Sequence, residues 1–135
     1  MLLSHNRWTL ADRTADSVIQ QAHEAGFGVI NAAPFGGGSL VRGFDAVPSY
    51  CYGPTTAETE RAIRAVEAIC EEAGVPLGAA ALQFSTRDER IHTTVAGISR
   101  PERIAEIAKW AEWDIPGDVW EALLAASGRD AGLDN

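Results

Sequence analysis

Apolar residues recur along the chain with two different periods, and together they predict strands that alternate with helices. Apolar runs of strand length occur at 2–5, 27–33 and 91–96, and a brief apolar run bounded by turn residues is typical of a β-strand. The run at 27–33 is nearly continuous, which is typical of a parallel strand covered on both faces. The sequence therefore predicts three strands.

A helix is predicted between the first two strands. Thr14 or Asp16 can cap its start, and Gly26 stands just beyond its end at about Ala25, where a left-handed residue commonly closes a helix. The helical spacing places four apolar residues on one face: Val18, Ile19, Ala22 and Ala25.

Four more helices are predicted in the rest of the chain. One begins at Thr56 and stops at Gly74, and Pro76 in a first-turn position starts a shorter one. Another follows the third strand, and Pro116 with Asp118 opens the last. The helix after the third strand has a predicted buried stripe of Ile104, Ile107, Ala108 and Ala111.

A segment rich in glycine and proline, residues 34–54, separates the second strand from the long helix. It also contains Tyr50 and Tyr52. A loop of this length inside a domain is usually functional or disordered. We therefore expect it either to contribute to a site or to be a floppy connector.

The predicted order is strand, helix, strand, loop, two helices, strand, helix, helix. Apolar strands that alternate with helices imply parallel pairing and right-handed crossovers, so the predicted fold class is α/β. Residues 1–135 suit a single domain. Three strands are few for such a sheet, so an edge remains that something should cover. The tryptophans are expected mostly in the core or at its rim, although Trp110 and Trp113 could also cover that edge.

Charge and cysteine content narrow the class of protein. The formal net charge is −8 and Lys109 is the sole lysine, which argues against nucleic acid as a main partner. Cys51 and Cys70 have no metal-binding spacing and are expected to be reduced thiols in the cytoplasm. We see no export signal and no apolar stretch of membrane-spanning length, so no membrane association is expected.

The candidate chemistry lies in residues 94–106, where a β-branched run and a glycine lead into a cationic helix start. The first N–H groups of a helix lack partners and favour an anion, so phosphate is the expected ligand. A capping box of Ser99 and Glu102 would explain these residues without a ligand. Arg103 and Glu106 could likewise form a surface ion pair. Neither alternative explains why Arg100 also stands at this helix start.

Three segments resemble the C-terminal part of the aldo-keto reductase family: residues 31–38, Leu82-Gln-Phe, and the Gly-x-Ser-Arg-Pro-Glu-Arg-x-x-Glu segment at 97–106. The residues at 4–10 and 50–52 resemble its aldose dehydrogenase branch. The resemblance implies a partial TIM (β/α)8 barrel of about three parallel βα units plus a C-terminal helix. It also implies NADP or NAD as cofactor, and an aldehyde or sugar as substrate.

The resemblance further implies which residues would bind the cofactor. Ser99 and Arg100 would meet the adenosine-side phosphate, and Glu106 would contact the adenine edge. Arg103 would stack on or pair with the adenine ribose phosphate. The family commonly has asparagine where this chain has Ile107. The full set implied for cofactor binding is Ala33, Pro34, Phe35, Gly36, Gly97, Ile98, Ser99, Arg100, Arg103 and Glu106.

The family's catalytic tyrosine, lysine, aspartate and histidine belong to the half of the barrel that precedes these segments, and none is assigned here. The first hypothesis is therefore the cofactor-binding part of an oxidoreductase. The alternative is a non-catalytic partial barrel that is completed by a partner chain or by its own copy. A third possibility is the product of a truncated reading frame.

Overall fold

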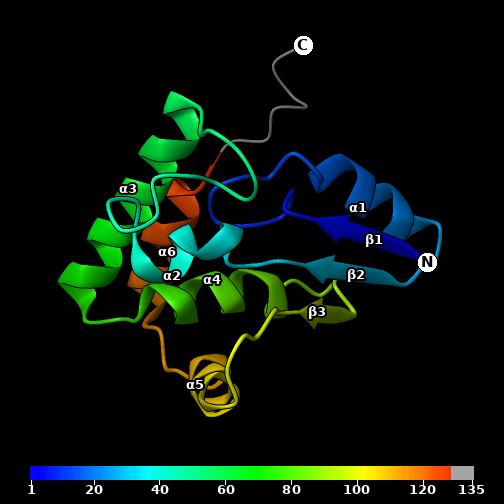
Figure 1. Ribbon diagram of the computed structural model, residues 1–135. Helices are drawn as coiled ribbons and strands as arrows, with labels where there is room; N and C mark the ends of the chain where they lie inside the picture. Colours follow the sequence, from blue (N-terminus) through cyan, green and yellow to red (C-terminus); the bar gives the residue numbers. More distant parts are fainter. Residues whose placement is uncertain (129–135) are drawn as a thin grey trace.

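The computed structural model describes residues 1–128 and shows strands that alternate with helices along the chain, as predicted (Figure 1). The elements in chain order are β1 (Leu2–His5), α1 (Asp16–Glu24), β2 (Val29–Ala32), the 3-10 helix η1 (Gly36–Gly38), α2 (Ser39–Arg42), α3 (Ala57–Ala73), α4 (Leu77–Thr86), β3 (Thr93–Val95), α5 (Glu102–Ala111) and α6 (Gly117–Ala126).

The three strands form one parallel sheet in the order β1-β2-β3. In register, His5 lies beside Ala32, and Ala32 lies beside Val95. The carboxyl ends of all three strands therefore meet at one edge of the sheet, where the arrows in Figure 1 point toward α2. In the described part of the chain β1 and β3 each pair with β2 alone, so each has one unpaired edge.

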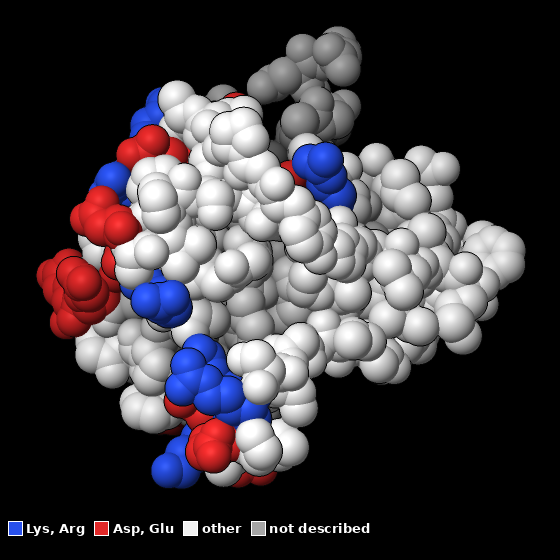
Figure 2. Space-filling model, viewed as in Figure 1, with Lys and Arg blue, Asp and Glu red and all other residues white. Residues whose placement is uncertain are grey.

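One face of the sheet is covered and the other is open. Val29 and Asn31 are fully buried beneath α1 and α4. On the opposite face Leu3 is 60% exposed and Val95 is 49% exposed, and Figure 2 shows no charged side chain over the strands. The prediction that the second strand is covered on both faces largely holds for that strand, because Ala32 is buried and Ile30 half-buried on this side too, whereas the flanking strands β1 and β3 are open there.

Helix α4 is the centre of the core. All of its residues from Gly78 to Ser85 are buried, and it contacts α2, α3 and α5. A Cβ at Gly78 would lie 2.5 Å from ring carbons of Trp110, so the glycine lets α5 approach α4 closely. Trp110 thus packs on a helix, and Trp113, 40% exposed, offers only its carbonyl to Gln83 on α4. The prediction that these tryptophans cover a sheet edge is wrong.

Some helix ends lie where the sequence predicts them and others do not. Gly26 and Gly74 adopt the left-handed conformation beyond α1 and α3, as predicted. The predicted cap of α1 is wrong: Ala15 occupies the cap position without a side-chain bond, and the Thr14 hydroxyl donates to Asp12. Pro76 likewise lies directly before α4 rather than within its first turn.

Helix α5 turns a different face inward from the one predicted. Ile104 is 58% exposed, and Ala108 and Ala111 are exposed too. Ile107 and the buried Trp110 make the contact with the core. The predicted stripe is thus correct only at Ile107.

The segment at 34–54 is ordered structure rather than a floppy connector. It contains η1 and α2, and it buries Leu40 and Phe44 in the core. Cys51 and Cys70 are both free thiols, as predicted. No helix within residues 1–128 is long and apolar enough to cross a membrane. Of the C-terminal tail, residues 129–135 lie outside the described part of the chain.

Candidate functional site

The loops that follow β2 and β3 form the walls of a cavity at the carboxyl edge of the sheet. They are tied together where the Ala33 N–H donates to the Val95 carbonyl at 3.0 Å. The cavity has a volume of about 460 Å³, which suits part of a cofactor-sized molecule. Its lining residues are Ala33, Phe35, Gly37, Gly38, Val41, Arg42, Gly97, Ile98, Ser99, Arg103 and Ile107.

The loop after β2 has an unusual backbone. Ala33 has a φ of 60°, and Gly36, Gly37 and Gly38 have φ values of 59°, 75° and 105°. A left-handed alanine is strained, whereas glycine adopts this conformation at no steric cost. Non-glycine outliers of this kind cluster at ligand-binding sites, and this one opens the loop that forms one wall of the cavity.

The opposite wall is the start of α5, where the predicted capping box does not form. Pro101 occupies the cap position of α5, and no side chain caps the helix. Ser99 is exposed, and its hydroxyl makes no hydrogen bond to residues 1–128. Capping therefore does not account for Ser99, and its hydroxyl can meet a ligand in the cavity.

Two arginines from distant parts of the sequence line this cavity. Arg42 ends α2, and Arg103 lies in the first turn of α5. Arg103 has an ion-pair contact with Glu106 at 3.4 Å, and both side chains remain partly exposed, so the pair is weak. Figure 2 shows basic side chains over and beside α5, with acidic side chains among them. Cations at a helix start oppose its dipole unless an anion lies between them.

Six of the ten predicted site residues line the cavity: Ala33, Phe35, Gly97, Ile98, Ser99 and Arg103. The other four do not. Pro34 and Gly36 are buried behind the wall, Arg100 is exposed, and Glu106 reaches the site only through Arg103.

The sequence prediction missed Arg42 and Val41, which also line the cavity. They belong to α2, a helix of four residues that is too short for an apolar period to reveal. A basic residue shortly after a glycine run was the signal available for Arg42. Ile107, noted above as a departure from the family pattern, also contributes to the lining.

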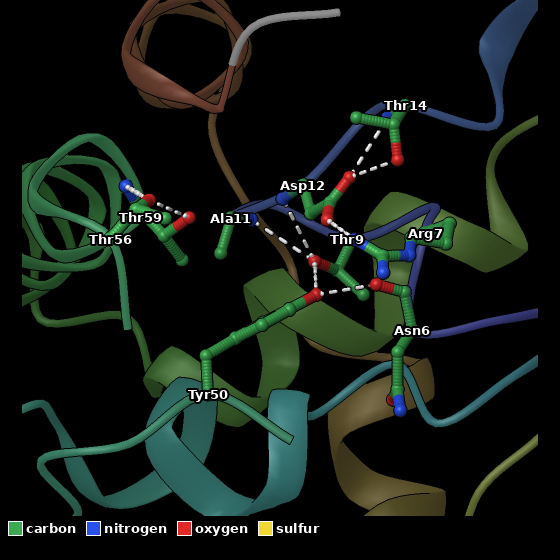
Figure 3. A network of polar contacts seen from close by, with 9 residues as sticks. All are labelled: Asn6, Arg7, Thr9, Ala11, Asp12, Thr14, Tyr50, Thr56 and Thr59. Carbon is green, nitrogen blue, oxygen red and sulfur yellow. Dashed lines mark hydrogen bonds and ion pairs between the residues drawn. The ribbon is translucent and has the colours of Figure 1, made fainter. Parts of the chain in front are cut away.

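A second cavity of about 420 Å³ lies beside the end of β1, lined in part by residues 50–56. His5 and Tyr52 stack there with ring centroids 6.0 Å apart, and Arg7 pairs with Asp12 at 3.0 Å. Tyr50 reaches the same region, as Figure 3 shows. Its hydroxyl lies 2.8 Å from the Thr9 hydroxyl and 2.9 Å from the Asn6 carbonyl.

Within residues 1–128, Tyr50 at the second cavity has no lysine beside it. Burial raises the pKa of Tyr50 well above its usual value, and its neighbours are a hydroxyl and a carbonyl rather than a lysine. Lys109 lies on α5. Among residues 1–128 there is also no cluster of histidine, cysteine or acidic residues that could hold a metal ion.

Comparison with known proteins gives consistent matches. A model of the aldo/keto reductase family matches residues 2–127. A pyridoxal 4-dehydrogenase from Microbacterium luteolum is 30% identical over 118 residues, which is 87% of this chain and 34% of the relative. A D-threo-aldose 1-dehydrogenase from a Pseudomonas species is 30% identical over 128 residues, 93% of this chain and 39% of the relative.

Solved structures share the fold. The aldo-keto reductase AKR11C1 from Bacillus halodurans, in its holo form, has a TM-score of 0.68 at 16% identity. The match covers 94% of this chain and 43% of that one. The apo form gives 0.64 at 17% identity. This chain therefore spans less than half the length of the proteins it matches, and its three parallel strands and helices are part of a (β/α)8 barrel.

Proposed function

The chain belongs to the aldo/keto reductase family, and we propose that its cavity binds the adenosine diphosphate portion of a nicotinamide cofactor. In this proposal the chain is the cofactor-binding part of an oxidoreductase that acts on an aldehyde or on a sugar hydroxyl. The substrate class follows the two relatives, whose names describe dehydrogenases of pyridoxal and of an aldose.

The observation that carries the proposal is the pair of arginines in one cavity with an uncapped helix start. Arg42 and Arg103 come from α2 and α5, and Ser99 offers a free hydroxyl between the glycine loop and the helix. Backbone N–H groups at a helix start, a glycine turn and arginine forks are the groups that recognise phosphate. The residues present therefore fit the phosphates of such a cofactor.

Each residue has a proposed role in binding. Ser99 and Arg100 meet the phosphate on the adenosine side, and Glu106 contacts the adenine edge. Arg103 binds the phosphate of the adenine ribose. Two cations in the cavity favour a cofactor with this additional phosphate, so we propose NADP rather than NAD. The cofactor supplies hydride transfer when bound, and the residues of this chain bind and orient it.

Titration of the protein with NADPH and with NADH tests this proposal, with quenching of tryptophan fluorescence as the signal. Arg103→Ala should weaken NADPH binding by roughly tenfold or more, because hydrogen bonds to charged groups contribute about 1.5–3 kcal/mol. NADH binding should change less. Arg61→Ala is the control, because Arg61 is an exposed arginine on α3. If the unaltered protein binds neither nucleotide, the proposal is wrong.

A second candidate function rests on the open face of the sheet. Leu3 and Val95 are exposed on that face, and β1 and β3 each have an unpaired edge. A surface of this kind is a template for pairing with another chain. The alternative proposal is a non-catalytic partial barrel that is completed by a partner chain or by a second copy. The oligomeric state of the purified protein tests this alternative.

A further inference from the structure

Tyr50 connects the loop that leaves α2 to the segment that follows β1. Figure 3 shows its side chain extending from the loop toward Thr9 and the Asn6 backbone. The hydroxyl lies 2.8 Å from Thr9 Oγ1 and 2.9 Å from the Asn6 carbonyl oxygen. Two segments more than forty residues apart are thereby joined at a single atom.

The direction of these hydrogen bonds follows from the lone pairs of Thr9 Oγ1 that other donors already occupy. Thr9 Oγ1 accepts from the N–H groups of Ala11 and Asp12, both at 3.1 Å. Both lone pairs of that oxygen are then occupied, so the Thr9 hydroxyl donates to Tyr50. The Tyr50 hydroxyl is left to donate to the Asn6 carbonyl. The chain of bonds is complete only with a hydroxyl at position 50.

The other side of Tyr50 supports the glycine loop that forms one wall of the cavity. A Cβ at Gly36 would lie 2.7 Å from Tyr50 Cε2, so the ring lies directly against the glycine backbone. The N–H of Cys51 donates to the Gly36 carbonyl at 3.0 Å, and a Cβ at Gly37 would lie 2.9 Å from the Cys51 carbonyl oxygen. The Tyr50–Cys51 segment therefore packs directly against the Gly36–Gly38 turn.

We propose that Tyr50 is a positioning residue that holds the Gly36–Gly38 turn in the conformation that receives the diphosphate of the cofactor. The inference rests on the proposed function of the cavity. Three consecutive left-handed glycines have large conformational freedom, so the turn needs support from outside in addition to its own hydrogen bonds, such as that from Ser39 Oγ to the Gly36 carbonyl. Tyr50 supplies this support by fixing the turn to the end of β1.

Two variants with matched chemistry separate this role from a general effect on folding. Tyr50→Phe removes the hydroxyl and keeps the ring. Tyr52→Phe is the control, because Tyr52 is 89% exposed and two residues away. Isothermal titration measures binding of NADPH and of adenosine 2′-phosphate, a probe that carries the phosphate proposed for Arg103 but no diphosphate. Hydrogen exchange at residues 36–38 reports on the turn itself.

We expect Tyr50→Phe to weaken NADPH binding roughly three- to tenfold, as is typical for loss of one hydrogen bond. Adenosine 2′-phosphate binding should stay unchanged, and exchange at residues 36–38 should rise. Tyr52→Phe should match the unaltered protein in all three measurements. If Tyr50→Phe does not fold, Thr9→Val is the second variant: it removes the donor to Tyr50 together with the acceptor of the Ala11 and Asp12 N–H groups, so it should give the same selective loss with a lower stability.

Three outcomes would overturn the inference. Equal NADPH binding by Tyr50→Phe would show that the hydroxyl does not position the turn. An equal loss for NADPH and adenosine 2′-phosphate would show a purely structural role. If the unaltered protein binds neither probe, the proposed function itself is wrong and the inference falls with it. The first two outcomes leave the proposed function intact, so the two failures are distinguishable.

Discussion

At the scale of single residues, burial has its clearest effect on the two cysteines. Burial raises the pKa of Cys51 and of Cys70 from 9.0 to about 11. For Cys70 the nearby Glu67 carboxylate adds to this shift. Because the thiolate is the reactive form, neither thiol is activated as a nucleophile.

The raised thiol pKa values predict a loss of stability in alkali. Between pH 9 and pH 11 these thiols ionise in the unfolded chain but remain protonated in the folded one. The unfolded state then binds fewer protons than the folded state, so the free energy of unfolding falls as the pH rises through this window. Urea unfolding at pH 7 and stepwise from pH 9 to pH 11 measures the fall.

Cys70→Ala provides the control for this prediction. Cys70 is 2% exposed, so at pH 7 the variant is less stable because a small cavity replaces the sulfur. The informative quantity is the slope of stability against pH, which should be shallower than in the unaltered protein. Identical slopes would mean that the Cys70 thiol does not titrate differently in the two states.

At the scale of elements, two helix starts that look alike in sequence behave differently. The Thr56 hydroxyl accepts from the Thr59 N–H at 3.2 Å and caps α3. Ser99 precedes α5 in a similar sequence setting but caps nothing. The difference arises because Pro101 occupies the cap position of α5, which leaves Ser99 two residues too early.

We predict that these two hydroxyls differ in their effect on stability. Thr56→Ala should lower the free energy of unfolding by about 1 kcal/mol, the usual cost of a lost cap. Ser99→Ala should change it by less than about 0.5 kcal/mol, as for an ordinary surface substitution. Chemical denaturation of both variants checks this. If Ser99→Ala lowers the free energy of unfolding as much as Thr56→Ala does, the Ser99 hydroxyl caps α5 in solution and the prediction is wrong.

The close approach of α4 and α5 gives a second prediction at this scale. Gly78→Ala places a methyl group 2.5 Å from the Trp110 ring, and overpacking of this kind costs about 1–3 kcal/mol. Gly117→Ala is the matched control, because nothing lies within 4 Å of a Cβ there. Thermal unfolding of both variants measures the difference. Equal midpoints would mean that α5 moves away from α4 without cost.

The elements that the sequence predicted well are those whose signals are local. Gly74 ends α3 and Thr56 caps it, because each acts through its own turn. The inward face of α5 was predicted less well, since a helical period also places Ile104 beside Ile107 and does not choose between faces. Gly78 determines which face of α5 turns inward, because its lack of a side chain leaves room for the Trp110 ring against α4.

The residues of the candidate site also differ in whether a local sequence signal predicts them. Ser99 and Arg103 were found because they stand within one short motif. Arg42 was not, because only the long-range fold brings α2 beside the start of α5. Tyr50 was noticed as an aromatic residue in a loop, but its contacts with Thr9 and Gly36 depend on chain segments distant in sequence. Local motifs therefore predict residues in both walls of the cavity, among them Phe35 and Ser99, and tertiary packing adds the residues of α2.

At the scale of the whole molecule, the open face of the sheet is the main apolar surface that no helix covers. Helices α1 and α4 cover one face, whereas Leu3 and Val95 remain exposed on the other. Figure 2 shows that no charged side chain protects the surface over the strands. Proteins usually place charges on such surfaces or cover them. In a complete (β/α)8 barrel this is the face that packs inward.

We therefore predict that the 135-residue chain associates reversibly through this face. Burial of apolar surface between two sheets contributes about 25 cal/mol for each Å² removed from water. Lysine at two positions of this face should prevent that burial and therefore the association. Sedimentation equilibrium over a wide range of protein concentration should show dimers or larger species for the unaltered protein. The double variant Leu3→Lys and Val95→Lys should be monomeric and equally stable, because both side chains are already exposed.

Leu124→Lys is the control for this prediction, because Leu124 is a partly exposed apolar residue on α6, which packs against α3 rather than the sheet. It should leave the association unchanged. A monodisperse monomer for the unaltered protein would contradict both the prediction and the alternative of completion by a second copy. Association that survives the double lysine variant would place the contact elsewhere. Because Leu124 lies on α6 and does not line the cavity proposed to bind the cofactor, Leu124→Lys should also leave NADPH affinity unchanged.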